Sequence, residues 1–147
     1  MLITRDYLSG FFDGEGYIGL IRHKDKRVKR GYTLHPFVRI TNTNKLILDE
    51  INKIVKGKIK SKPKQLGCKQ CYMIELQNAD SIFEFLCYIH PHLIIKEKQS
   101  ELMIEFCRGR VKDNKNKEYT SEELSLYFSF KQLNKRGEEL GILPTTL

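Results

Sequence analysis

Apolar and polar positions repeat with two different periods along this chain, and each period predicts one type of element. After Thr4, which can cap a helix, Leu8, Phe11 and Phe12 form one apolar face over residues 5–13. Strand-like alternation follows over 17–24 and again over 33–41. Further along, the pattern predicts a helix over 45–55 that Asn42 or Asn44 can cap, strands over 58–62 and 69–76 around a turn at 63–67, and helices over 79–89 and 96–108.

The resulting order is α-β-β-α-β-β-α, followed by C-terminal helices. It predicts an α+β fold in which a four-stranded antiparallel sheet carries helices on one face and leaves the other open. Residues 111–119 read as a polar loop, and Thr120 with Glu123 forms a capping box for a last helix ending near Gly137. We therefore expect a core over residues 1–110 and a loop and helix over 111–147 that pack on it.

The net charge of the chain indicates what kind of partner this fold could bind. The 147 residues carry a formal charge of +8, which favours a polyanionic partner such as nucleic acid. The alternative is a basic protein without such a partner. Alternation places several cations on the open sheet face, which can enter a DNA major groove or can simply be solvated: Arg39, Lys58, Lys60, Lys62, and Arg22 or His23.

The cysteines and the lack of long apolar runs say less about the function of the protein. Cys68 and Cys71 form a lone C-x-x-C without a second pair, so reduced thiols are favoured over a zinc site. No apolar run approaches the ~20 residues of a membrane span, and no targeting segment is visible at the start of the chain. We therefore expect no membrane partner, and a protein encoded in a chloroplast or mitochondrion or made in a prokaryotic cytoplasm.

The stretch "LSGFFDGEG" at residues 8–16 is the main candidate for chemistry. Gly10 and Gly14 share one helix face, where a second copy of the same helix could approach about a two-fold axis. Each copy would then bring Glu15 to the axis, and paired carboxylates favour a divalent metal. Asp13 would bind backbone N–H groups of the partner helix or of its own turn. The alternative interpretation is an ordinary helix stop followed by a tight turn.

The same stretch closely resembles the signature of the LAGLIDADG homing endonucleases. Leu8, Gly10, Asp13 and Gly16 match its positions, and Glu15 stands where the family places its metal-binding acid. The resemblance extends to "RITNTNKLILDEI" (39–51), where Asn42 matches an active-site polar residue, and to "HPHLIIKEKQ" (90–99), where Lys96, or Lys98 in a shifted register, matches a lysine near the cleaved phosphate.

The resemblance implies a site-specific double-strand DNA endonuclease that cuts a long pseudo-palindromic target. A single motif implies a homodimer, with Gly10, Asp13 and Gly14 at its interface. Glu15 and the Gly14 carbonyl would hold Mg²⁺ or Mn²⁺, Asn42 would order solvent, and Lys96 would stabilise charge on phosphate. The open face and the 25–31 loop would contact DNA through Arg22, His23, Arg30, Thr33, His35, Arg39, Lys58, Lys60, Lys62, Lys69, Cys71 and Met73.

Two alternatives fit the same scaffold. One is a maturase that binds its own intron RNA, and the other is a DNA-binding regulator without catalysis. Retention of Glu15 favours the nuclease over the regulator. A chain of this size favours an intron over an intein as the host element.

Overall fold

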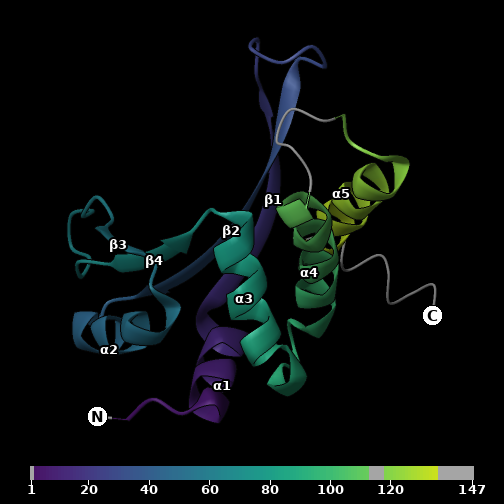
Figure 1. The fold of residues 1–147 in the computed structure, drawn as a ribbon. Coiled ribbons are helices and arrows are strands. Elements are labelled where there is room, and N and C mark those ends of the chain that lie inside the picture. Colours follow the sequence, from purple (N-terminus) through teal and green to yellow (C-terminus); the bar gives the residue numbers. More distant parts are fainter. Residues whose placement is uncertain (1, 113–117, 136–147) are drawn as a thin grey trace, which may run out of the picture.

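The computed structural model describes residues 2–112 and 118–135, with the side chains of 111 and 112 left undescribed. Its elements follow the predicted order (Figure 1): α1 (Arg5–Glu15), β1 (Gly16–Lys24), β2 (Tyr32–Asn42), α2 (Lys45–Val55), β3 (Lys58–Ser61), β4 (Tyr72–Leu76), α3 (Ala79–Ile89), a 3₁₀ turn (His90–His92), α4 (Glu97–Lys112) and α5 (Ser121–Leu133). The predicted α-β-β-α-β-β-α order is confirmed.

The four strands form one antiparallel sheet in the order β1-β2-β4-β3. Helices α1, α2 and α3 pack on one face of it, and α4 lies beside α3 and also contacts β1 (Figure 1). The predicted architecture, with one covered and one open face, is therefore confirmed. Within the described residues, no helix is both long and apolar enough to cross a bilayer.

The core lies between the sheet and the helices, where the alternation placed it. Ile18, Ile40 and Ile74 point to the covered face from three neighbouring strands, and each is almost fully buried. The fully buried Phe12 of α1 meets Phe85 of α3 edge-on, with ring centroids 5.4 Å apart. This contact fixes the end of α1 against the body of the protein, and that end carries the candidate chemistry.

The β1–β2 ribbon continues beyond the point where β4 ends, opposite Val38, so β2 becomes an edge strand there (Figure 1). Pro36, which has no N–H to leave unpaired, lies in this edge segment. The Leu34 N–H, which would otherwise be free, donates to the Tyr119 hydroxyl over 2.7 Å. The segment before α5 therefore takes the place of a missing strand and supports the ribbon.

Several boundaries differ from the predictions. Helices α1 and α4 run on to Glu15 and Lys112, past their predicted ends at 13 and 108. β3 ends at Ser61 and β4 begins at Tyr72, so Lys62, Lys69 and Cys71 lie in the connection between the strands. The Lys62 N–H still donates to the Cys71 carbonyl over 2.9 Å, which keeps that connection paired. Helix α5 has the predicted capping box but ends at Leu133, and the predicted end near Gly137 lies outside the described residues.

Candidate active site

The site forms where α1 passes directly into β1. The Thr4 side chain caps the start of the helix, and at its end the Gly16 N–H donates to the Phe12 carbonyl. A Cβ at Gly16 would overlap the Phe12 ring, so only glycine lets the chain enter the strand this tightly. Glu15 is the last helical residue and is exposed to solvent. Among the described residues, its carboxylate accepts no hydrogen bond and is therefore free to bind a ligand.

Asp13 has a different environment from Glu15. Its carboxylate accepts three backbone N–H groups of its own chain, from Ile94 and Ile95 at 2.9 Å each and from Lys96 at 2.8 Å. Burial alone raises the pKa of Asp13, but these three bonds and the Lys96 charge together hold it below its ordinary value. The donors expected from the sequence, on a partner helix or on its own turn, were wrong, because the segment before α4 supplies them.

Lys96 is brought to the end of α1 by the same segment. Its ammonium group donates to the Asp13 carbonyl over 2.5 Å, at the end of a helix where carbonyls lack partners and cations are favoured. Burial lowers the pKa of Lys96, and the nearby Asp13 and Glu15 carboxylates act in the opposite direction. Lys96 and Glu15, predicted to act together, therefore lie together at one helix end.

Asn42 lies at the same end of the sheet, since β1 starts at Gly16 opposite Ile40 and Asn42 is the last residue of β2. Its side-chain oxygen accepts the Asn44 N–H over 2.8 Å, while Asn44 itself caps α2 through a 3.1 Å bond from the Ile47 N–H. Of the two caps that the sequence allowed, Asn44 is the correct one. In the part of the chain that the structure describes, the Asn42 amide N–H groups have no acceptor, so they are available to a ligand or to solvent.

Gly10 and Gly14 lie on the exposed side of α1. A Cβ added at either position meets nothing within 4 Å, and neither residue has a positive φ. Each glycine costs a helix about 1 kcal/mol relative to alanine, yet nothing within residues 2–112 and 118–135 requires it. Tyr7 and Phe11, stacked with centroids 6.0 Å apart, lie on the same side of the helix. We call these four residues the glycine face.

The open face of the sheet carries most of the predicted DNA contacts. His23 and His35 lie side by side, with ring centroids 4.8 Å apart, and burial followed by the His23 charge lowers the pKa of His35. Arg39 stacks on Phe37 at 4.2 Å, and Phe37 in turn lies over Gly19, where a Cβ would overlap its ring. His35, Phe37 and Arg39 on this face are therefore held by neighbouring side chains, whereas Lys58 is exposed to solvent.

Besides Lys62, Lys69 and Cys71 in the β3–β4 connection, two more predicted DNA contacts lie off the open face. Arg22 pairs across the strands with Leu34 on the covered face and stacks on Tyr32 at 4.5 Å. His23, not Arg22, is therefore the β1 residue on the open face, because successive side chains of a strand alternate. Arg30 stacks on the Tyr119 ring at 4.4 Å, which draws it toward the helices rather than outward from the loop.

Glu75 is the residue of this face that the sequence analysis missed. Its carboxylate binds Arg39 Nε at 2.6 Å and Lys60 Nζ at 2.7 Å, and its side chain is only 4% exposed. Burial alone raises the pKa of Glu75, but the bonds from Lys60 and Arg39 lower it overall. The alternation of the strand already put Glu75 on the same face as Met73. Its pairing with Arg39 could not be predicted, because it depends on β4 lying next to β2 in the sheet.

Comparison with known proteins identifies the class. A family model described as LAGLIDADG endonuclease matches residues 8–101, which is more than half of the chain, so the protein belongs to the LAGLIDADG endonuclease family. The matched segment contains the end of α1, the open face and the segment that carries Lys96. A search of curated protein sequences finds no match.

Solved structures share the fold at low sequence identity. An archaeal intron-encoded homing endonuclease in complex with DNA, I-Vdi141I, superposes with a TM-score of 0.76 at 20% identity, covering 90% of this chain and 85% of the other. The homing endonuclease I-CvuI, in complex with its target, gives 0.71 at 18%, with 91% and 83% covered. I-SmaMI, bound to cleaved DNA, gives 0.73 at 18%, covering 99% of this chain but 49% of the other.

Proposed function

We propose that this protein is a site-specific double-strand DNA endonuclease that acts as a homodimer and hydrolyses phosphodiester bonds with a divalent metal. The observation that carries the proposal is the end of α1, where the unpaired Glu15 carboxylate lies beside the Lys96 ammonium group. An intron is the proposed host element, in line with the intron-encoded relative I-Vdi141I. The proposed target is long and pseudo-palindromic, because a symmetric dimer reads two half-sites.

The homodimer is supported by the glycine face. Gly10 and Gly14 leave an open strip on a helix that would be more stable with alanine, and Tyr7 and Phe11 flank it with exposed or half-buried rings. A second copy of α1 placed against this strip explains both glycines, since it could approach backbone to backbone. I-SmaMI supports the same arrangement, because this chain covers only about half of it. Two copies of this chain would therefore match the length of one I-SmaMI chain.

A divalent cation fits the donors at the end of α1. Glu15 and the Gly14 carbonyl, which lacks an intrahelical partner, are both oxygen donors of the kind that Mg²⁺ and Mn²⁺ prefer. Within residues 2–112 and 118–135, no three metal-binding side chains cluster, so the remaining ligands would come from outside this chain: Glu15 of a second copy, DNA phosphate oxygens or water. Complexes of I-CvuI have been prepared in the presence of calcium and of magnesium.

The chain's own groups define the rest of the mechanism. When bound, the metal supplies charge neutralisation and water activation for an in-line displacement at phosphorus. Lys96 uses one N–H on the Asp13 carbonyl, which leaves two N–H groups for the scissile phosphate. The Asn42 amide orients the attacking water. Asp13 acts indirectly, because it fixes the segment that positions Lys96.

The open face would bind the major groove, with phosphate contacts dominating affinity and base contacts setting sequence preference. Lys62 and Lys69, which lie in the connection between β3 and β4, would contact phosphates beyond that end of the sheet. Binding should weaken steeply as salt rises, because each neutralised phosphate releases counterions. Flat binding between low and high salt would contradict a DNA partner for this face.

Cleavage of a randomised DNA library by the purified protein tests the function and yields its target. Glu15→Gln keeps the size of the side chain but removes its charge, so it should abolish cleavage in Mg²⁺ while binding stays within about tenfold, roughly 1.4 kcal/mol. Asp49→Asn is the matched control, because it removes a charge from an exposed ion pair on α2. Chelation should mimic Glu15→Gln in the wild type.

Each contrary result of these assays would contradict a different part of the proposed function. Full cleavage by Glu15→Gln would remove that residue from the site. Binding of one sequence without cleavage in Mg²⁺ or Mn²⁺ would indicate a regulator, and splicing of intron RNA without cleavage would indicate a maturase. If sedimentation shows a monomer under the conditions in which both DNA strands are cut, the proposal that two copies share one active site is refuted.

A further inference from the structure

The open face contains an acid at the centre of its cations. Glu75 of β4 lies directly opposite Arg39 of β2 on one side and Lys58 of β3 on the other, and Lys60 reaches it diagonally. An acid at this place weakens attraction to phosphate, so solvation of a basic surface does not account for it. Its role must lie in what it does to its neighbours.

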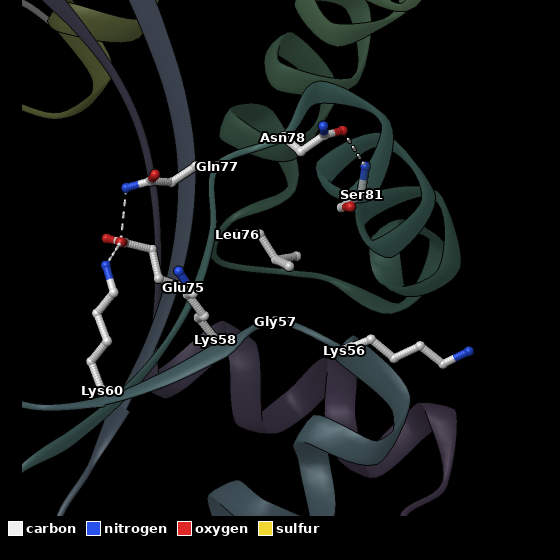
Figure 2. A pocket seen from close by; sticks show the side chains of 9 residues that line it. All are labelled: Lys56, Gly57, Lys58, Lys60, Glu75, Leu76, Gln77, Asn78 and Ser81. Carbon is white, nitrogen blue, oxygen red and sulfur yellow. Dashed lines mark hydrogen bonds and ion pairs between the residues drawn. The ribbon is translucent and has the colours of Figure 1, made fainter.

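The Glu75 carboxylate is enclosed by its donors. Its Oε2 accepts Arg39 Nε, while Oε1 accepts Lys60 Nζ and the Gln77 amide at 2.7 and 2.8 Å, and Figure 2 shows the Lys60 and Gln77 bonds converging on it. The acid is 4% exposed, whereas the Arg39 and Lys60 side chains are 39% and 47% exposed. A base edge can therefore reach the two cations but not the carboxylate.

Arg39 is held from two directions. The carboxylate occupies its Nε side, and the Phe37 ring lies against the guanidinium at 4.2 Å. Among the described residues, no acceptor binds the two Nη groups of Arg39. An arginine with its Nη pair free can donate two bonds to guanine O6 and N7, which is the commonest specific contact in the major groove. Fixing the guanidinium before binding reduces the rotamer entropy lost on contact.

We propose that Glu75 is a positioning residue for DNA sequence recognition, which holds Arg39 and Lys60 in the orientation that reads base edges. This inference rests on the proposed DNA-binding function and assigns part of its specificity. Glu75 does not touch DNA itself. Without Glu75, the flexible Arg39 and Lys60 side chains could bind any nearby phosphate. With it, their hydrogen-bond donors point in a fixed direction.

The experiment compares base preferences at every target position for the wild type, Glu75→Gln, Arg39→Ala and the double variant. Binding to a library built on the selected target gives the preferences, and binding to unrelated DNA gives the nonspecific affinity. Arg39→Ala defines the position that Arg39 reads. At that position Glu75→Gln should lower discrimination by about tenfold, while nonspecific affinity is unchanged or tighter because one negative charge is gone.

The double variant tests whether Glu75 acts through Arg39. With Arg39 replaced by alanine, Glu75→Gln should cause no further loss at that position. Gln77→Ala, which removes one exposed donor to the same carboxylate, should give a smaller relaxation and protects the test against misfolding of Glu75→Gln. Asp49→Asn should leave every preference unchanged.

Three results would overturn the inference. Unchanged preferences in Glu75→Gln would remove its positioning role while leaving the endonuclease intact. Even loss of affinity across all sequences would reduce Glu75 to a purely structural residue. If the wild type selects no DNA sequence at all, the proposed function fails, and the role assigned to Glu75 fails with it.

Discussion

Replacing each acid of "DGEG" by its amide should change the stability of the fold at one position, Asp13, and not at the other, Glu15. Asp13 is 8% exposed and accepts three backbone N–H bonds, whereas Glu15 is exposed and accepts none among the described residues. Asp13→Asn should therefore destabilise the fold, and Glu15→Gln should leave it unchanged. The pair is well matched, because each change removes one carboxylate and the two positions are two residues apart.

The cost of Asp13→Asn follows from its contacts. The asparagine oxygen can take the place of Oδ2 and keep the Ile94 and Ile95 donors, but its NH₂ group then faces the Lys96 N–H. One charge-assisted bond is lost and one partly buried donor, the Lys96 N–H, is left unpaired, which together cost about 2–4 kcal/mol. Glu15→Gln should stay within about 0.5 kcal/mol of wild type, as surface changes do.

Urea unfolding at one fixed protein concentration measures both values, since the stability of a dimer depends on concentration. The pH dependence gives a second reading. The pKa of Asp13 is lowered in the folded state, so its stabilisation is complete above the unfolded value of about 3.9 and is lost as pH falls through the folded pKa. The gap between wild type and Asp13→Asn should therefore close in acid. Equal stability of the two at neutral pH would refute the reasoning.

Three further changes test other parts of the fold. Gly10→Leu should convert the proposed dimer to a monomer whose helix α1 is at least as stable, and a dimer of this variant in sedimentation would contradict the proposed interface. Gly19→Ala should cost about 1–3 kcal/mol in thermal unfolding, because its methyl would displace the Phe37 ring; an unchanged melting temperature would contradict this contact. Tyr119→Phe leaves the Leu34 N–H unpaired and should cost about 1 kcal/mol, with faster amide exchange at residue 34; unchanged exchange would show that the hydroxyl does not protect this edge.

The elements that the sequence predicted best are those whose signals are local. The helix over 45–55 was predicted with its observed bounds, because Asn44 caps it, its apolar face is continuous, and Lys56 ends it with a positive φ before Gly57. The strand over 69–76 was predicted too long. There Gln70 bonds backbone carbonyls through its side chain, which replaces a strand ladder with a turn and leaves no trace in the apolar pattern.

The sequence named the residues of the candidate site but not the hydrogen bonds that hold them. The resemblance placed Glu15, Asn42 and Lys96 in one site, and the fold brings them to one end of the sheet. The partners of Asp13 lie some eighty residues away in the sequence, so no local pattern could supply them. Glu75 was hidden for a similar reason, since its role depends on strands β2 and β3 lying on either side of β4.

The glycines of the motif resolve into two kinds once the contacts are known. Gly16 is required by the chain itself, because the Phe12 ring fills the space of a side chain. Gly10 and Gly14 are required by nothing within the described residues, and a helix without a reason for two glycines points to a reason outside it. The same division separates the acids, since Asp13 is satisfied within the fold and Glu15 is not. Each member of the motif facing inward thus has its partner in this chain, whereas Gly10, Gly14 and Glu15 are exposed and have no partner among the described residues, as the proposed contacts with a second copy and with DNA require.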